Sequence, residues 1–171
     1  NHESPSENAY LAGKIITGAV KGLNTRGRYC FIKHFALYGV SKQPNGGIGD
    51  HQWMTEQAMR ENYLKQFRMA FVDGGALGCM TTYQGVGAEH SETTLGLLTG
   101  VLRREWKFKG AITTDAIGSK GTPEYADSLL RCGGNLGMGC SLTYGGYDSS
   151  ASPRLQQRMR ESVKQVLYMC L

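Results

Sequence analysis

Proline is scarce in this 171-residue sequence, with four residues, and no stretch of apolar residues is long enough to cross a membrane. A membrane helix needs about 18 consecutive apolar residues, so none is expected. The sequence has five cysteines, an odd number, and no two of them form a CxxC motif. Both features argue against a disulfide framework and against a zinc site. The motifs GxGxxG, GKS, GKT, GxSxG and HExxH are also missing, so common signatures of phosphate-binding loops, nucleophile-elbow hydrolases and zinc peptidases are absent.

Charge is also sparse. Charged residues make up 19% of the sequence and apolar residues 40%, a balance typical of a globular domain rather than of a disordered chain. The net charge is +5, but the basic residues are scattered, with local density only at 26–28, 103–104 and 154–160. No basic stripe alternates with aromatic residues, so nucleic-acid binding is not expected. Glycine, at 24 residues, is abundant and is typical of a fold with many short turns.

The apolar residues follow a helical period in some segments and form short strand-like runs between them. Residues 39–49 and 84–90 are rich in glycine or polar side chains and are expected to be loops, and Ser91 is expected to cap the helix after the second loop. The predicted order is α-β-α-β-α-β-α-β-α, with no internal boundary, so residues 1–171 are expected to form one domain. The predicted helices cover 8–24, 53–72, 91–106, 122–132 and 152–169, and the predicted strands cover 29–35, 77–82, 111–114 and 135–138.

Strict alternation of strands and helices predicts an α/β fold with a parallel sheet. Four strands are too few for a closed barrel, which needs about eight. The sheet is therefore expected to be either open or one half of a (β/α)8 TIM-type barrel, with unpaired backbone groups on its outer strands. In a barrel of this kind, chemistry takes place at the carboxyl ends of the strands.

Ionisable residues close two of the predicted strands. Lys33 and His34 lie at the end of the first, and Asp115 directly follows the third. Alone, Lys33 and His34 are consistent either with packing roles or with a pair of donors that binds vicinal hydroxyls of a polar ligand. Asp115 alone could equally cap a helix or bind a metal. Asp50 and His51 form a second candidate metal pair, but they have no third ligand at a suitable spacing, and a solvated loop is expected there.

In combination these motifs resemble the N-terminal barrel domain of glycoside hydrolase family 3, the β-glucosidase family. The strongest part is the segment 98–110 followed by Thr114 and Asp115, which is similar to the family's nucleophile block. The resemblance covers nearly the whole chain and follows the family's order. The other similar segments are 3–11 (ESPSENAYL), 32–37 (IKHFAL), 53–64 (WMTEQAMRENYL), 81–84 (TTYQ) and 132–138 (CGGNLGM).

The resemblance implies a role for each matching residue. Asp115 would be the nucleophile, Lys33 and His34 would bind sugar hydroxyls, and Tyr83 would lie beside the nucleophile. It implies no metal and no organic cofactor. The sequence departs from the family pattern after the KHF motif, where residues 38–44 contain no arginine, and at Ala116, where an aromatic residue is common. The KHFPGHG pattern of the N-acetylglucosaminidase branch is absent, which favours a glucosidase- or xylosidase-type substrate.

The resemblance therefore predicts an incomplete barrel domain, the second half of the family's N-terminal domain. The implied reaction is retaining hydrolysis of a β-linked glucoside or related oligosaccharide through a covalent glycosyl-Asp115 intermediate. One alternative is a catalytically incomplete fragment that binds sugar weakly, or a half-barrel that is stable as a homo-oligomer. Another is an unrelated open α/β domain that binds phosphate through its glycine-rich loops. The acid/base residue of the reaction is not assigned by the sequence.

Overall fold

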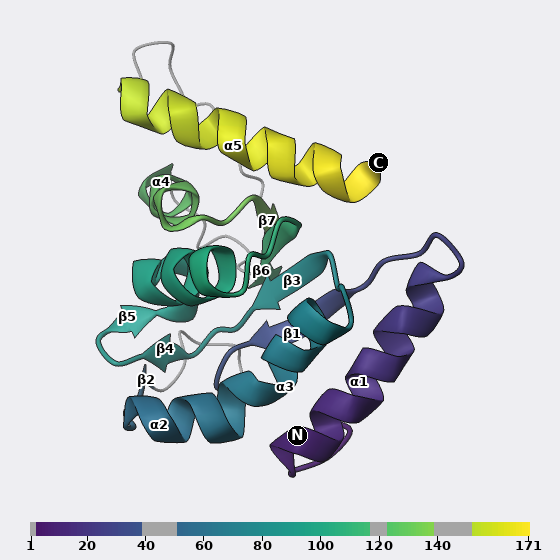
Figure 1. The fold of residues 1–171 in the computed structure, drawn as a ribbon. Helices are drawn as coiled ribbons and strands as arrows, with labels where there is room; N and C mark the ends of the chain where they lie inside the picture. Colours follow the sequence, from purple (N-terminus) through teal and green to yellow (C-terminus); the bar gives the residue numbers. More distant parts are fainter. Residues whose placement is uncertain (1–2, 39–50, 117–122, 139–151) are drawn as a thin grey trace.

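The computed structural model describes residues 3–38, 51–116, 123–138 and 152–171, with the backbone alone for 123–126. Helices surround a central parallel sheet, and a second, smaller sheet lies beside it (Figure 1). The predicted loop 39–49, Asp50 of the candidate metal pair and the predicted first residue of the 122–132 helix lie outside the described residues.

Four strands form the central sheet in the order β1-β3-β6-β7, and every neighbouring pair is parallel. Within the described residues, β1 and β7 are therefore the outer strands. The predicted alternation of strands and helical crossovers is confirmed, with strand limits within two residues of those expected. The strands are β1 (Phe31–Phe35), β3 (Gly78–Thr81), β6 (Ala111–Ala116) and β7 (Leu136–Met138).

Helices cover the sheet and carry the connections between its strands. The first is α1 (Ala9–Asn24), whose N-cap Asn8 accepts hydrogen bonds from two backbone amides of the first turn. A continuous helical stretch precedes β3 and includes wider π-type turns. Its parts are α2 (Glu56–Ala58), η1 (Met59–Leu64), α3 (Lys65–Arg68) and η2 (Met69–Asp73), and the later helices are η4 (Gly96–Glu105), α4 (Pro123–Cys132) and α5 (Pro153–Cys170).

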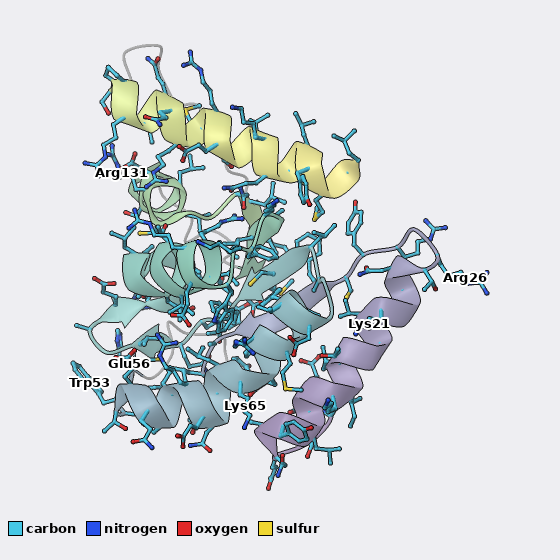
Figure 2. The ribbon with its side chains drawn as sticks, in the orientation of Figure 1. Lys21, Arg26, Trp53, Glu56, Lys65 and Arg131 are labelled. Carbon is cyan, nitrogen blue, oxygen red and sulfur yellow. The ribbon has the colours of Figure 1, made fainter. Side chains whose placement is uncertain are left out.

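The helices expose most of their charged side chains to solvent and pack buried apolar side chains against the sheet, although α1 and α5 also expose apolar side chains. Lys21, Glu56, Lys65 and Arg131 project outward from four helical segments in Figure 2. The core between helices and sheet is centred on Phe35, which is fully buried. Its ring makes edge contacts with Phe67 and Phe71 of the helical stretch before β3 and with Trp106 directly after η4, at centroid distances of 5.2 to 6.2 Å. Burying such a side chain contributes about 1.5–3 kcal/mol, so Phe35 anchors the end of β1.

Three local expectations were wrong. The helix expected from residue 53 begins at Glu56, because the Thr55 side chain accepts the Ala58 amide and caps it. Ser91 lies in a 3-10 turn, η3 (Ser91–Thr93), and caps no helix. Its hydroxyl instead donates to the carbonyl of Thr82 at 2.6 Å and accepts the amide of the same residue at 3.3 Å. Ser91 has the residue type of a helix cap, but its hydroxyl is used by the backbone of Thr82, nine residues earlier in the chain.

The third error concerns the predicted loop 84–90, which contains a β-hairpin. Strands β4 (Gly85–Val86) and β5 (Glu89–His90) pair antiparallel, and β2 (His51–Gln52) pairs parallel with β4. Gly87 has φ +61° at the first of the two loop positions, where a type II′ hairpin turn requires glycine. Each strand has only two residues, which is too short to produce a visible alternation in the sequence.

Candidate active site

The carboxyl ends of the central strands bring three of the predicted site residues together. His34 and Asp115 are each the last but one residue of their strands, β1 and β6, and Tyr83 lies two residues beyond β3. Because these strands are parallel neighbours, their ends meet at one edge of the sheet. The structure thus places the three side chains at the rim where barrel enzymes carry their chemistry.

Within the described residues, Asp115 is contacted by the backbone of Ala116 and by the side chain of His34. Its Oδ1 accepts the amide of Ala116 at 2.7 Å, and its Oδ2 lies 3.3 Å from Nε2 of His34. The Asp115 and His34 side chains are 11% and 10% exposed, so the pair is largely shielded from water. A carboxylate in such surroundings is well ordered and interacts strongly with nearby donors.

Burial lowers the pKa of His34 below its ordinary value of 6.5. The Lys33 ammonium acts in the same direction, whereas Asp115 and Glu3 oppose it. The imidazole is therefore neutral at neutral pH, with one nitrogen protonated. A proton on Nε2 makes His34 a donor toward the carboxylate of Asp115, because that nitrogen faces it.

Tyr83 also lies close to Asp115. Its hydroxyl donates to the carbonyl oxygen of Ala116 at 2.8 Å. Burial, followed by the charge and hydrogen-bonding capacity of Asp115, raises the pKa of Tyr83 to about 12. Glu92 and Tyr38 contribute smaller effects in the same direction. The phenol stays protonated at neutral pH and remains a hydrogen-bond donor beside the carboxylate.

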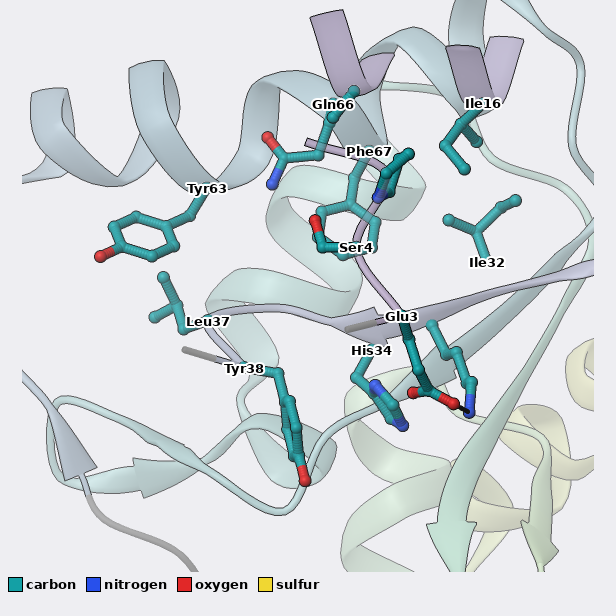
Figure 3. A pocket seen from close by; sticks show the side chains of 13 residues that line it. Glu3, Ser4, Ile16, Ile32, His34, Leu37, Tyr38, Tyr63, Gln66 and Phe67 are labelled. Atoms are coloured by element: carbon teal, nitrogen blue, oxygen red, sulfur yellow. Dashed lines mark hydrogen bonds and ion pairs between the residues drawn. The ribbon is translucent and has the colours of Figure 1, made fainter. Parts of the chain in front are cut away.

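Lys33 lies apart from this group. Its Nζ donates to Oε1 of Glu3 at 3.0 Å, and both side chains are about half exposed. Lys33 and His34 line an adjoining cleft of about 150 Å³, walled by the N-terminal segment, α1, β1 and the helical stretch before β3. In Figure 3, Glu3 and His34 lie together at one side of this cleft. The sequence-predicted residues thus divide into the His34–Tyr83–Asp115 group and a lysine at the edge of the neighbouring cleft.

Sequence reasoning missed three residues around the site. The Tyr38 ring stacks on His34, Glu3 pairs with Lys33, and Glu92 is buried with 4% exposure close enough to influence Tyr83. None of the three lies in the same short sequence motif as the residue that it contacts. Glu3 matches the family's first segment, but its partner Lys33 lies thirty residues later in the chain.

The described residues contain no group of three His, Cys, Asp or Glu side chains that could hold a metal ion. Of the candidate metal pair, His51 has Nδ1 2.8 Å from the carbonyl oxygen of Gly87 and a ring 5.2 Å from that of His90. These contacts tie the small sheet together. Within the same described ranges, no helix is long and apolar enough to cross a membrane.

Comparison with known proteins places this geometry in a family. The model of the glycosyl hydrolase family 3 N-terminal domain matches residues 1–165. Beta-glucosidase B of Emericella nidulans is 38% identical over 129 residues, which is 75% of this chain and 15% of that protein. The beta-glucosidase of Kluyveromyces marxianus is 34% identical over 68% of this chain and 14% of its own length. The chain thus spans about 15% of the length of these curated relatives.

Solved structures show the same fold. A crystal structure of the Kluyveromyces marxianus beta-glucosidase superposes on 98% of this chain and 21% of its own, with a TM-score of 0.80 and 25% identity. The Bifidobacterium adolescentis GH3 beta-glucosidase superposes on 96% of this chain and 24% of its own, with a TM-score of 0.78 and 26% identity. The predicted α/β fold, with parallel strands as part of a (β/α)8 barrel, is confirmed by these superpositions together with the parallel sheet.

Proposed function

Because the chain belongs to the glycosyl hydrolase family 3 N-terminal domain family, we propose that its site performs the nucleophilic half of retaining β-glucoside hydrolysis. The observation that carries the proposal is the carboxylate of Asp115. It is shielded from water at the carboxyl end of a barrel strand and faces the neutral His34 at 3.3 Å. The substrate class follows from the relatives, which are named beta-glucosidases, and from a similar Kluyveromyces marxianus structure described as a complex with glucose.

In the first step, a carboxylate oxygen of Asp115 attacks the anomeric carbon of the glucosyl unit. A new carbon–oxygen bond forms as the glycosidic bond breaks, and the leaving oxygen takes the electron pair of that bond. The product is a glycosyl ester of Asp115. In the second step, water attacks the same carbon and loses one proton to the solvent, while the bond between that carbon and the Asp115 oxygen breaks. Asp115 leaves as a carboxylate, and the sugar regains its original anomeric configuration because two inversions have taken place.

The surrounding residues provide hydrogen bonds for these steps. The neutral imidazole of His34 donates from Nε2, and the Lys33 ammonium has two further protons besides the one directed at Glu3, which suits neighbouring sugar hydroxyls. The Tyr83 phenol, whose pKa is raised from its ordinary value of 10.0 to about 12, stays protonated close to the carboxylate. His34 thus supplies a donor to the anionic centre, and Lys33 supplies donors at the edge of the adjoining cleft, while the negative charge of Asp115 passes to the leaving group.

A second carboxyl group is needed to protonate a poor leaving group, at about 5–5.5 Å from the nucleophile in retaining enzymes. We assign no residue of this chain to that role and propose that these residues form an incomplete barrel domain of a larger catalytic unit. A leaving group that is stable as an anion needs little acid assistance. A dinitrophenyl β-glucoside is therefore the substrate on which this chain can act alone.

Trapping of the intermediate tests the proposal directly. The chain is incubated with a 2-deoxy-2-fluoroglucoside that has a dinitrophenyl leaving group. The fluorine slows both formation and hydrolysis of the ester, and the activated leaving group speeds its formation alone, so the ester accumulates. Mass spectrometry is expected to find the fluoroglucosyl group on the peptide that contains Asp115. Asp115→Asn is expected to abolish labelling, whereas Asp73→Asn, on an exposed position of η2, should label normally.

Chemical rescue gives an independent measurement. Asp115→Gly removes the nucleophile and leaves space beside His34, and added azide is expected to restore cleavage by direct attack. The product would be the glucosyl azide of inverted configuration. Full turnover by Asp115→Asn on the aryl glucoside would refute the nucleophile assignment.

A second function, sugar binding without turnover, is favoured by one observation, the small share of the relatives' length that this chain spans. Glucose would then raise the melting temperature of the chain increasingly with its concentration, but no dinitrophenolate would be released. Stabilisation by inorganic phosphate in place of glucose would instead support the phosphate-binding alternative.

A further inference from the structure

The imidazole of His34 has an aromatic ring against one face. The ring of Tyr38 stacks on it with centroids 4.5 Å apart and planes inclined by 26°. Figure 3 shows both rings on the same side of the cleft. Tyr38 lies four residues beyond His34, after a turn that follows β1, and it also lines the cleft. The Tyr38 side chain therefore both lines the cleft and contacts His34, the histidine beside Asp115.

The turn that presents Tyr38 is fixed by the core. Leu37 has φ +73°, in the left-handed region that non-glycine residues occupy at a cost of about 1–2 kcal/mol. Its side chain is only 2% exposed and belongs to the same core cluster as Phe35. Burial of Leu37 offsets the unfavourable backbone conformation and determines the direction in which the chain leaves β1. The stack of Tyr38 on His34 is thus set by two buried neighbours, Phe35 before the turn and Leu37 within it.

The stack restricts the one freedom that matters for His34, rotation of the ring about χ2. With one face against Tyr38, the imidazole keeps its edge toward β6, where Nε2 lies 3.3 Å from Oδ2 of Asp115. A rotated ring would withdraw this nitrogen from the carboxylate. The terminal torsion of histidine is broad in the absence of packing, so an external contact is needed to define it.

We propose that Tyr38 is a positioning residue that orients the His34 imidazole for its hydrogen bond in the active site. The inference rests on the proposed function for its catalytic consequence, but the orientation of His34 can be measured separately. Stacking requires a planar ring and not a hydroxyl group. Phenylalanine at position 38 should therefore serve as well as tyrosine, and leucine, which is apolar but not planar, should not.

The first measurement uses the imidazole itself. NMR titration of the chain reports the pKa and tautomer of His34, whose charged and titratable neighbours are Lys33, Glu3, Asp115, Tyr38 and Tyr83. Tyr38→Leu is expected to bring the His34 pKa closer to its ordinary 6.5, since water reaches the uncovered ring face, and to mix the two neutral tautomers. Tyr38→Phe is expected to leave both unchanged. Tyr168→Leu, on exposed α5, is the matched control for loss of a tyrosine ring.

The second measurement is release of dinitrophenolate from the aryl β-glucoside. Tyr38→Leu is expected to lower kcat/KM about 10- to 100-fold, with the larger part in kcat, because a misaligned donor acts mainly in the transition state. Tyr38→Phe should retain nearly full activity. Circular dichroism of each variant verifies that its fold is intact.

Two results would overturn the proposal. One is an unchanged His34 titration in a folded Tyr38→Leu variant. The other is an equal loss in Tyr38→Phe, which would assign the effect to the hydroxyl. If no glucoside is hydrolysed by the unmodified chain, the proposed function fails while the NMR titration still decides whether Tyr38 orients His34.

Discussion

His34 and Tyr83 lie close to the same carboxylate, and both side chains are neutral at neutral pH. For His34 burial lowers the pKa, whereas for Tyr83 burial together with Asp115 raises it to about 12. Two neutral donors therefore lie close to one anion, which avoids placing a second charge in a poorly solvated site. The same carboxylate accepts the amide of Ala116, so its orientation does not depend on either side chain alone.

The lowered pKa of His34 makes stability depend on pH. Between this pKa and 6.5 the unfolded chain binds the proton and the folded chain does not, so stability falls as pH decreases through this window. His34→Gln lacks this effect. The difference in melting temperature between the unmodified chain and His34→Gln is therefore expected to shrink from about pH 7.5 to about pH 5.

Thermal unfolding followed by circular dichroism measures this difference. The pKa of His90 is also lowered, by burial and by His51, and it contributes in the same direction. The unmodified chain and His34→Gln both retain His90, so its contribution cancels in the difference between their melting temperatures. A difference that stays constant across the pH range would show that His34 titrates normally in the folded chain.

The sequence allowed the proximity of Asp115 and His34 to be predicted. Each residue closes a strand-like run, and parallel strands bring their carboxyl ends together. Tyr38 could not be predicted in the same way. Its position depends on the left-handed backbone at Leu37 and on burial of that side chain, neither of which leaves a periodic pattern. The pairing of Lys33 with Glu3 was equally invisible, because it joins a strand to a segment thirty residues earlier.

Among the elements, η4, β6 and β7 are joined by one buried network at the end of the sheet opposite Asp115. The Arg103 guanidinium of η4 donates to the carbonyls of Gly110 and Gly133 and to Oδ1 of Asn135. The same Oδ1 accepts the amide of Ile112 at 2.7 Å. Burial lowers the pKa of Arg103 to about 10, so it stays charged at neutral pH. The network fixes where β6 begins, and thereby where Asp115 lies at its other end.

The start of β6 also leaves no room for a side chain. A Cβ at Gly110 would lie 1.8 Å from the carbonyl oxygen of Leu77, which accepts the amide of Ala111. Gly110→Ala is therefore expected to separate β3 from β6 and to destabilise the chain by about 3 kcal/mol, near the upper limit for overpacking. Gly22→Ala is the matched control, since a Cβ there meets nothing within 4 Å and the residue lies inside α1.

Urea unfolding monitored by circular dichroism compares the two variants. Gly22→Ala is expected to stabilise the chain by about 0.5–1 kcal/mol, because alanine loses less backbone entropy than glycine in a helix. Similar unfolding midpoints for Gly110→Ala and the unmodified chain would mean that β3 and β6 pair differently from the register described here.

Long elements such as α1 and α5 could be predicted because they have enough residues to show a period. The hairpin of β4 and β5 was missed because two-residue strands have no measurable alternation. Ser91 was misassigned since its hydroxyl satisfies the backbone of Thr82 rather than a helix end. Local propensity could not reveal this choice between two hydrogen-bond partners.

For the whole molecule, unpaired sheet edges and exposed apolar side chains occur together. In the described residues the outer strands are β1 and β7, and the terminal helices α1 and α5 each carry exposed apolar side chains. Exposed apolar patches and unpaired strand edges both favour association with another protein surface. The side chains concerned are 46% to 57% exposed: Tyr10, Leu11 and Ile15 on α1, and Val163, Leu167 and Tyr168 on α5.

We therefore expect the isolated chain to self-associate rather than to remain a compact monomer. Sedimentation velocity at increasing concentration should show a sedimentation coefficient that rises with concentration, since each molecule offers two apolar surfaces to its neighbours.

Leu11→Glu and Leu167→Glu, one on each terminal helix, are expected to reduce association because a charge would then have to be desolvated at the contact. Leu95→Glu is the control: Leu95 is 52% exposed but immediately precedes η4, in the connection between the two central strands, β3 and β6. A concentration-independent monomer with a single cooperative thermal transition would contradict this expectation and would mean that the four-stranded sheet and its helices are sufficient for a stable fold.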